Sequence, residues 1–433
     1  MEEHLSREVL TVQGGIPLKG EVTVSGAKNS VLPLLAACLL SSAPCLLENC
    51  PCITDVDCAL RILTHLGCSV QRDGHRIWVD PSCVTENAVP EPLMREMRSS
   101  IIFLGAVLAR TGQAQLSYPG GCELGPRPID LHLEALKKLG ATVEEQAGRV
   151  DCRGNLYGRP ITLAFPSVGA TENIMLAACT AVGETTLINA AREPEIVDLQ
   201  EFLNAMGARI SGAGSTVIHI SGVPIQSLHG ASCHVMPDRI EAGTYLIAAA
   251  ATGGEVTLRR VQPLHMEAEL SVLERMGLQL TRGTDLLTLR ARGRPCAAGK
   301  VVTGPYPGFP TDLQAVLTGL LAVSSGTSLV VETVFKSRFR HAGELLRLGA
   351  DLHCEGNLCV VQGVERLTGA SLCAADLRGA AGLLVAALAA EGTSKIGRSC
   401  YIRRGYEYLE EKIASLGGKV ERDWEHGATE GGL

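Results

Sequence analysis

The chain has 433 residues, of which 46% are hydrophobic, so it holds enough apolar material for two domains with separate cores. Its net charge of −7 and its aromatic content of 3% argue against nucleic acid as the main partner. No apolar run is long enough to cross a bilayer without interruption, and the acidic N-terminus lacks the basic-then-apolar order of a secretory signal. We therefore expect a cytoplasmic protein without membrane insertion.

The 16 cysteines show no paired C-x-x-C spacing, and the chain has no H-E-x-x-H motif. Neither pattern of zinc ligands is therefore present, and the sequence predicts no metal and no other cofactor. In a cytoplasmic protein the cysteines should also be reduced.

A helix of one kind recurs six times along the chain, with apolar residues at intervals of three and four, and each copy ends in a hydrophobic residue and a glycine. These glycines lie 67 to 73 residues apart, where a helix usually ends in a left-handed cap. They are Gly67, Gly140, Gly207, Gly277, Gly349 and Gly417. A strand begins within three residues of each, and after five of the six a hairpin follows.

Each repeat also contains a helix that is apolar on nearly every side and should be buried. These helices are predicted at residues 30–40, 99–109, 170–181, 241–251, 312–322 and 379–390. Strands flank them, so the repeat is predicted as β-α-β-α-β-β. Because one repeat cannot bury its own apolar faces, we predict an α+β (mixed α/β) fold with helices inside, sheets outside, and two lobes of three repeats each.

The stretch 117–133, SYPGGCELGPRPIDLHL, places one thiol in a loop before a helix start. Glycines on both sides of Cys122 allow the loop to bend tightly and to move, which is typical of a lid. Arg127 and Pro128 then lead into a helix over 129–139, whose first amides favour an anion. Cys122 could instead be a small buried hydrophobe, as most cysteines are, but its polar loop favours a functional thiol.

Basic residues stand at the starts of predicted helices, where a cation opposes the helix dipole. They are Lys28, Arg98, Arg239 and Arg378 before buried helices, and Arg127 and Arg404 before amphipathic ones. Six such placements in an acidic chain indicate a shared anionic ligand with more than one negative group. Alternatively, these side chains reach solvent or pair with neighbours such as Asp238 and Asp376.

Five residues are open to a purely structural interpretation. Asp312 starts a buried helix and could be either an N-terminal cap or a general base. Ser167 and Thr171 could simply be caps. His132 and His341 have no partner motif nearby, so a satisfied structural histidine is the better interpretation of both.

Ten short blocks, in one order from Val12 to about Val420, resemble a known family. They are SGAKN at 25–29, MRSS at 97–100, PGGCELGPRPIDLH at 119–132, SVGATENIM at 167–175, AREPEIVDL at 191–199, PDRIEAGT at 237–244, FPTDLQA at 309–315, FKSRF at 335–339, DLRGA at 376–380 and RRGYE at 403–407. The family is that of the UDP-N-acetylglucosamine 1-carboxyvinyltransferases, which are enolpyruvyl transferases.

The resemblance implies two lobes of the inside-out α-β prism type, each made of three β-α-β-α-β-β repeats. The expected lobes are residues 21–236, which carry the mobile Cys122 loop, and residues 1–20 together with 237–433. The active site is expected in the cleft between them. This fold agrees with the repeat count derived from the pattern of glycines and apolar helices.

The resemblance also assigns residues to two small-molecule substrates. Those implied to bind phosphoenolpyruvate are Lys28, Asn29, Arg127, Arg378 and Arg404. Those implied to contact the UDP-sugar are Arg98, Arg127, Pro128, Ile129, Asp130, Leu131, Ser167, Val168, Asp312 and the Val334 backbone. The implied reaction transfers the enolpyruvyl group to the sugar 3′-hydroxyl and releases phosphate, as the first committed step of peptidoglycan synthesis.

In this chemistry the sugar hydroxyl loses a proton as it attacks the central carbon of phosphoenolpyruvate, while the terminal methylene gains one. Asp312 resembles the base and Cys122 the acid, and the thiol can also be trapped as a covalent adduct. The cations stabilise developing charge without a metal. The resemblance further implies that the epoxide antibiotic fosfomycin alkylates Cys122.

Two alternatives remain. A 3-phosphoshikimate 1-carboxyvinyltransferase uses the same enol chemistry without the mobile GGC loop, so Cys122 argues against it. A silent paralogue that binds a UDP-sugar and regulates by interaction would be expected to lack Cys122, Asp312 or Lys28, and the chain has all three.

Overall fold

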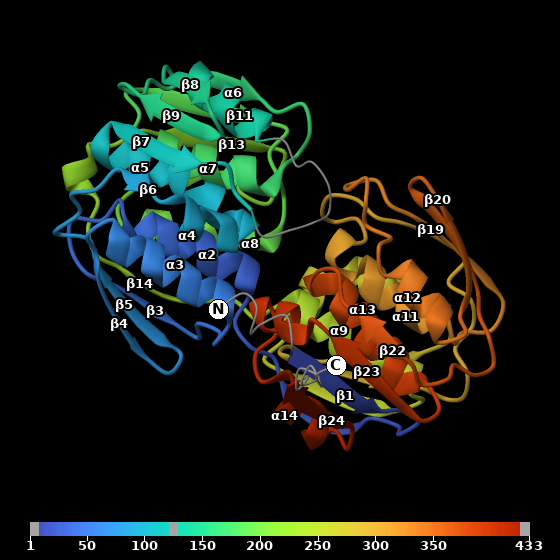
Figure 1. Cartoon of the computed structure of the whole chain (residues 1–433). Coiled ribbons are helices and arrows are strands. Elements are labelled where there is room, and N and C mark those ends of the chain that lie inside the picture. The colour runs from blue at the N-terminus through green and yellow to red at the C-terminus, as the bar shows by residue number, and fades with distance from the viewer. Residues whose placement is uncertain (1–7, 121–128, 425–433) are drawn as a thin grey trace, which may run out of the picture. The chain divides into compact units, whose positions relative to one another are not determined.

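The computed structural model describes residues 8–120 and 129–424, which form two compact units (Figure 1). The inserted unit comprises the described residues from Ser25 to Asp238. The terminal unit comprises those up to Val24 and from Arg239 onward. Among the described residues, no helix is both long enough and apolar enough to cross a membrane.

The first boundary falls after Val24 rather than after residue 20, because β2 (Lys19–Thr23) pairs with β15 (Glu255–Arg259) of the terminal unit. The second falls after Asp238 rather than after residue 236. Pro237 pairs with Gly26, and the Asp238 N–H donates to the carbonyl of Ser25, so both residues stay with the inserted unit.

Each unit contains three four-stranded sheets of one topology, in which the first strand is parallel to the second and the other pairs are antiparallel. In the inserted unit the sheets are β14 (Ser232–His234), β3 (Cys45–Glu48), β5 (Arg76–Asp80), β4 (Ser69–Asp73); β6 (Ala88–Val89), β7 (Gln113–Ser117), β9 (Arg149–Arg153), β8 (Thr142–Gln146); and β10 (Pro160–Thr162), β11 (Glu184–Ile188), β13 (Val217–Ser221), β12 (Arg209–Ser211). In the terminal unit they are β2, β15, β17 (Leu286–Arg290), β16 (Gln279–Arg282); β18 (Lys300–Val302), β19 (Thr327–Val331), β21 (Leu358–Gln362), β20 (Asp351–Glu355); and β22 (Ser371–Cys373), β23 (Thr393–Gly397), β1 (Glu8–Gln13), β24 (Lys419–Trp424).

Three strands join sheets far from their place in the sequence. β2 begins a repeat that the chain completes only after building the whole inserted unit, and β14, which ends that unit, supplies the first strand of its first sheet. β1 takes the place of a second hairpin strand beside β24. This explains why the sequence shows a hairpin after only five of the six repeats, and it confirms the β-α-β-α-β-β unit.

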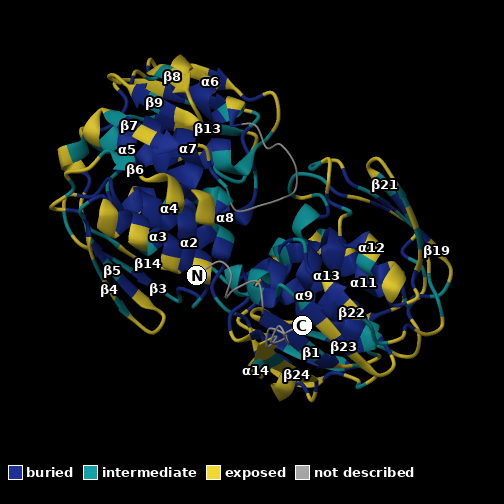
Figure 2. Ribbon diagram, in the orientation of Figure 1, coloured by how far each residue is buried: buried dark blue, intermediate teal, exposed yellow. Residues whose placement is uncertain are grey.

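The apolar helices pack together in the core of each unit, as predicted (Figure 2). In the inserted unit they are α2 (Lys28–Cys38), α5 (Phe103–Thr111) and α7 (Val168–Ala178), and in the terminal unit α9 (Arg239–Ala251), α11 (Gln314–Leu321) and α13 (Leu377–Ala389). Close approach requires glycine here, since a Cβ on Gly382 would lie 2.4 Å from the carbonyl oxygen of Ala315.

Shorter or more amphipathic helices complete the repeats. They are α3 (Thr54–His65), α4 (Glu91–Glu96), α6 (Asp130–Lys138), α8 (Pro194–Ala205), α10 (Glu267–Arg275), α12 (Ala342–Arg347) and α14 (Leu409–Ser415), with 3-10 turns η1 (Arg98–Ile102), η2 (Ile225–Ser227), η3 (Pro263–Met266), η4 (Thr311–Leu313) and η5 (Ser399–Arg404). The six repeat glycines all have positive φ, between 84° and 105°, which confirms the predicted left-handed caps.

One pair of cysteines contradicts the expectation that all of them are reduced. Cys354 and Cys359 are direct cross-strand partners in the hairpin of β20 and β21 and form a disulfide. Their Cα atoms are 4.1 Å apart because antiparallel pairing brings opposite residues close.

Candidate functional site

Four of the six predicted cations stand at helix starts, as expected. Lys28 and Arg239 are the first residues of α2 and α9, and Arg378 is the second residue of α13. Arg98 begins η1, which leads directly into α5. Lys28, Arg239 and Arg378 are buried, so these charges are held within the protein rather than extended into solvent.

Lys28 has its charge balanced inside the inserted unit. Its Nζ lies 2.6 Å from Oδ2 of Asp55 in the first turn of α3, and both side chains are buried. Its backbone N–H donates to Oδ2 of Asp238 at 3.2 Å. Asn29, the next residue, is half-buried. The cation is therefore held at the start of α2 by a carboxylate that the sequence analysis did not single out.

Asn173 of α7 fixes the state of His132 in α6. Its Oδ1 accepts from the N–H of Gly105 at 2.7 Å, and its Nδ2 donates to the carbonyl of Ile101 at 2.9 Å and lies 2.7 Å from Nδ1 of His132. The two backbone partners identify the amide nitrogen, so Nδ1 of His132 accepts and the imidazole is neutral. Burial and, to a smaller extent, the Arg98 guanidinium together lower the pKa of His132 to about 4. His132 is thus a satisfied structural histidine, as predicted.

The start of α6 lies beside the start of α7. A Cβ on Gly169 would lie 3.1 Å from Cε1 of His132. Residues 129–131 form the N-cap and first turn of α6, with 129 buried, 130 exposed and 131 half-buried. Arg98 is half-buried and its Nη1 donates to the carbonyl of Pro119 at 3.4 Å. The inserted unit therefore holds six of the residues predicted to contact the UDP-sugar at or near two adjacent helix starts, namely Arg98, Ile129, Asp130, Leu131, Ser167 and Val168.

Ser167 is the N-cap of α7, and its Oγ accepts from the N–H of Ala170 at 3.3 Å. Thr171 lies inside the helix, where its Oγ1 accepts from the N–H of Ala191 at 3.0 Å. The interpretation as a cap is confirmed for Ser167 and wrong for Thr171. Val168, the first helical residue, is half-buried.

Asp312 is not a helix cap. Pro310 holds the N-cap position of η4, and Asp312 lies within this turn. Its Oδ1 accepts from Nη2 of Arg338 at 3.0 Å and lies 3.5 Å from Nε of Arg378. Both guanidinium groups are buried, whereas the Asp312 side chain is 31% exposed. Asp312 is thus a partly exposed carboxylate whose Oδ1 lies beside two buried guanidinium groups.

Arg338 also holds the backbone beside Asp312. Its Nε and Nη2 donate to the carbonyl of Thr311 at 3.3 and 3.2 Å, and its guanidinium carbon lies 5.5 Å from the ring centre of Phe335. Val334 donates its N–H to Oε1 of the buried Glu332 at 2.8 Å.

Arg378 and the segment that carries Arg404 are close in the terminal unit. The N–H groups of Arg378 and the following residue donate to Oδ1 of Asp376, the N-cap of α13. The Arg378 guanidinium lies 5.4 Å from the ring centre of Tyr406, and a Cβ on Gly405 would lie 3.5 Å from its Nη1. Arg404 is half-buried at the end of η5.

Three predicted residues, Cys122, Arg127 and Pro128, lie outside the described residues. His341 is buried, and burial lowers its pKa to about 4. Neither ring nitrogen of His341 has a hydrogen-bond partner among the described residues, so the prediction of a satisfied structural histidine is wrong at this position.

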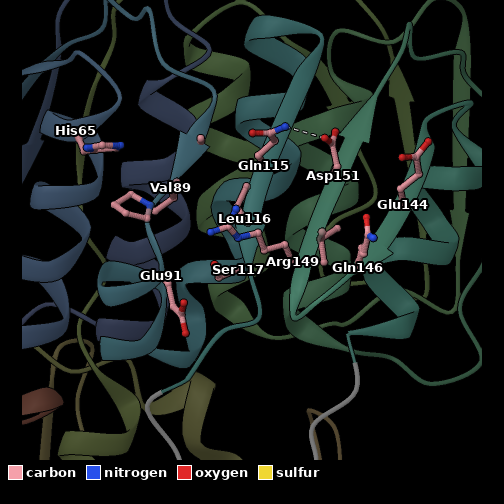
Figure 3. Close-up of a pocket in the computed structure, with 13 residues that line it drawn as sticks. His65, Val89, Glu91, Gln115, Leu116, Ser117, Glu144, Gln146, Arg149 and Asp151 are labelled. Carbon is pink, nitrogen blue, oxygen red and sulfur yellow. Dashed lines mark hydrogen bonds between the residues drawn. The ribbon is translucent and has the colours of Figure 1, made fainter.

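The inserted unit also has a groove of about 360 Å³ beside the sheet of β6, β7, β9 and β8 (Figure 3). None of the predicted site residues that the structure describes lines it. Its charged residues include Glu91, Glu144 and Asp151 but only one arginine, Arg149, and the Gln115 amide donates to Asp151 at 2.7 Å. With three carboxylates to one guanidinium, the groove does not suit an anionic ligand.

The sequence analysis did not single out three residues that contact residues it did single out, namely Lys28, His132 and Asp312. Asp55 resembled an ordinary acidic residue in a first helical turn, and Asn173 lay inside an apolar helix. Arg338 was visible within the block FKSRF, but only a spatial contact shows that it binds Asp312.

The matching family model is that of EPSP synthase (3-phosphoshikimate 1-carboxyvinyltransferase), over residues 12–413. This match covers most of the chain and includes every described residue named in this section. The chain belongs to this family.

Curated relatives narrow the assignment. The chain is 49% identical over 412 residues to UDP-N-acetylglucosamine 1-carboxyvinyltransferase 2 of Caldanaerobacter subterraneus, covering 95% of this chain and 98% of the relative. It is 45% identical to the UDP-N-acetylglucosamine 1-carboxyvinyltransferase of Shewanella amazonensis, covering 95% and 99%. Within the family, the chain therefore groups with the UDP-N-acetylglucosamine 1-carboxyvinyltransferases.

Solved structures share the fold. The enolpyruvyl transferase NikO from Streptomyces tendae matches with a TM-score of 0.89 and 27% identity, covering 97% of this chain and 99% of that one. EPSP synthase from Acinetobacter baumannii matches with a TM-score of 0.73 at 18% identity, covering 96% and 100%, which supports the fold alone. The predicted fold class is confirmed.

Proposed function

We propose that the protein transfers the enolpyruvyl group of phosphoenolpyruvate to the 3′-hydroxyl of UDP-N-acetylglucosamine and releases phosphate. The observation that carries this proposal is the 49% identity, over 95% of the chain, to a relative named for that activity. The product commits carbon to peptidoglycan, and hence to the cell wall, cell shape and division. Both substrates are highly charged and do not cross a bilayer freely, so we assign the reaction to the cytoplasm.

Phosphoenolpyruvate carries a phosphate and a carboxylate, and its proposed ligands are Lys28, Asn29, Arg127, Arg378 and Arg404. Burial supports this role for Lys28 and Arg378, since a cation in a low-dielectric site binds an anion more strongly than one in water. Their existing partners, Asp55 and Asp312, hold the cations in place. These cations also stabilise the charge that develops as phosphate leaves.

The proposed general base is Asp312, which accepts the proton of the sugar 3′-hydroxyl as it attacks. Its partial exposure and its two guanidinium neighbours support this role, because they hold the carboxylate in one orientation while leaving part of it accessible. Cys122 is the proposed acid that protonates the terminal methylene. Its role is assigned from residue type and family resemblance.

The UDP-sugar is proposed to contact Arg98, Ser167, Val168 and residues 127–131, together with Asp312 and the Val334 backbone. The adjacent starts of α6 and α7 support this set, since free N–H groups at helix starts favour phosphate groups.

The experiment is phosphate release from phosphoenolpyruvate with two acceptors. Phosphate should appear with UDP-N-acetylglucosamine and not with shikimate 3-phosphate or without an acceptor. Release with shikimate 3-phosphate alone would favour the 3-phosphoshikimate alternative, and no release with either would favour a silent paralogue.

A further inference from the structure

Glu332 follows β19 and has a side chain that is only 2% exposed, yet the sequence analysis gave it no role. Its Oε2 accepts from Oγ1 of Thr311 at 2.9 Å, and its Oε1 accepts from the N–H groups of Val334 at 2.8 Å and Phe335 at 3.1 Å. Both carboxylate oxygens are therefore occupied by donors from two segments of the chain.

These two segments both carry proposed site residues. Thr311 precedes Asp312, and Val334 is the proposed backbone contact of the UDP-sugar. Arg338 joins the same segments a second time, because it donates to the Thr311 carbonyl and to Asp312 while its guanidinium lies near the Phe335 ring. The segment of Asp312 and the segment of Val334 are thus joined twice, once by the Glu332 carboxylate and once by the Arg338 guanidinium.

The sheet itself does not need this carboxylate. In two other repeats the residue after the second strand is an asparagine in the left-handed region, Asn49 or Asn189. Its Nδ2 donates to the carbonyl that follows the parallel edge strand, Val235 at 2.9 Å or Leu163 at 2.8 Å.

In the repeat of β19 the equivalent bond to the edge strand comes from the next residue. Oγ1 of Thr333 donates to the carbonyl of Thr303, which follows β18, at 2.6 Å. Glu332 holds the position of the asparagines, but it has no positive φ and its side chain turns to Thr311 instead. This departure from the repeat joins the two site segments, which is where a functional demand overrides a local rule.

We propose that Glu332 is a positioning residue that sets Asp312 and Val334 relative to each other; this inference rests on the proposed function. A carboxylate suits the task because it accepts all three bonds, and bonds to a charged acceptor are shorter and stronger than neutral ones. Its side chain is only 2% exposed, so it is not placed to contact substrate. Its effect on the reaction comes through the geometry of the base and the sugar contact.

The test compares Glu332→Gln, Glu332→Ala and Thr311→Val with the unchanged protein in the phosphate-release assay. Asn189→Ala is the matched control, because it removes the side chain at the equivalent position of another repeat, where no proposed site segment is joined. Each variant is measured for thermal unfolding and for kcat and KM with each substrate, per folded enzyme.

Glu332→Ala should lower kcat by about 10- to 100-fold and raise KM for UDP-N-acetylglucosamine, since a misplacement of about 1 Å costs on the order of 100-fold in rate. Glu332→Gln keeps the shape and should recover part of the loss. Thr311→Val should also lower kcat. In the double variant with Glu332→Ala the two losses should be less than additive, because both substitutions remove the same hydrogen bond between Thr311 and Glu332. Asn189→Ala should lower stability alone, with kcat and KM near those of the unchanged protein.

A Glu332→Ala variant that matches Asn189→Ala, with lower stability but unchanged kcat and KM, would overturn the proposal. Fully additive effects of Thr311→Val and Glu332→Ala would overturn it as well. The acceptor that the unchanged protein uses tests the proposed function separately from the role of Glu332. If it uses only shikimate 3-phosphate the proposed function fails, and the same variants are then compared on that acceptor.

Discussion

Lowering the pH should destabilise the inserted unit through His132. The folded imidazole has a pKa of about 4, against an ordinary value of about 6.5 for an unfolded histidine. Between these values the unfolded state binds the proton and the folded state does not, so protons favour unfolding. The stability contribution is complete above about pH 6.5, falls with pH, and stops falling below about pH 4.

The magnitude follows from the shift of about 2.5 pKa units, which corresponds to roughly 3 kcal/mol in full and about 2 kcal/mol at pH 5. The hydrogen bond from Asn173 gives the same sign, because a proton on Nδ1 would set two donors against each other. His341 has a shift of the same direction in the terminal unit, so the test must isolate one residue.

Urea unfolding at pH 7 and pH 5 measures this for the unchanged protein and for His132→Gln, whose amide oxygen can still accept from Asn173. The variant should lose about 2 kcal/mol less than the unchanged protein between the two pH values. His219→Gln, at an exposed histidine of the same unit, is the control and should leave the pH dependence unchanged. Equal losses in His132→Gln and the unchanged protein would refute the reasoning.

Three further predictions concern the proposed site. Lys28→Met should destabilise the inserted unit by roughly 3 to 5 kcal/mol because it leaves Asp55 buried without its cation, and adding Asp55→Asn should restore stability in urea unfolding but not phosphate release. Asp312→Asn should abolish turnover and cost about 2 kcal/mol, because a neutral amide oxygen accepts from Arg338 more weakly than a carboxylate does; retained turnover would place the base elsewhere. Cys122→Asp should keep turnover at a lower pH optimum and resist fosfomycin, whereas Cys122→Ala should lose both activity and labelling by mass spectrometry; an inactivating adduct on another cysteine would exclude Cys122.

The sequence predicts the repeats well because their signals are local. A glycine such as Gly140 must follow a helix that ends in a left-handed cap, and the apolar helices have no polar face to expose. Strand exchange is different, since nothing local in 19–23 or 232–234 says which sheet each segment joins. The two units therefore divide after Val24 and after Asp238, a few residues beyond the ends of the expected lobes.

The partners of the predicted site residues could not be derived from spacing. Lys28 and Asp55 lie in different helices, and Asp312 meets Arg338 across 26 residues. Residue type alone left Asp312 between a cap and a base. The structure excludes the interpretation as a cap, because Pro310 holds the N-cap position and the Asp312 carboxylate contacts guanidinium groups.

The repeats offer a way to separate scaffold from site that needs no ligand. Where two repeats perform the same structural task with equivalent residues, as Asn49 and Asn189 do, the residue belongs to the sheet. In the repeat of β19 the next residue, Thr333, makes the bond to the edge strand, so the preceding position is not needed for that bond and can serve another role. Glu332 occupies that position, and its side chain joins the segments of Asp312 and Val334. The same comparison treats the buried Arg338 as part of the site, because its bonds join those two segments rather than strands of a sheet.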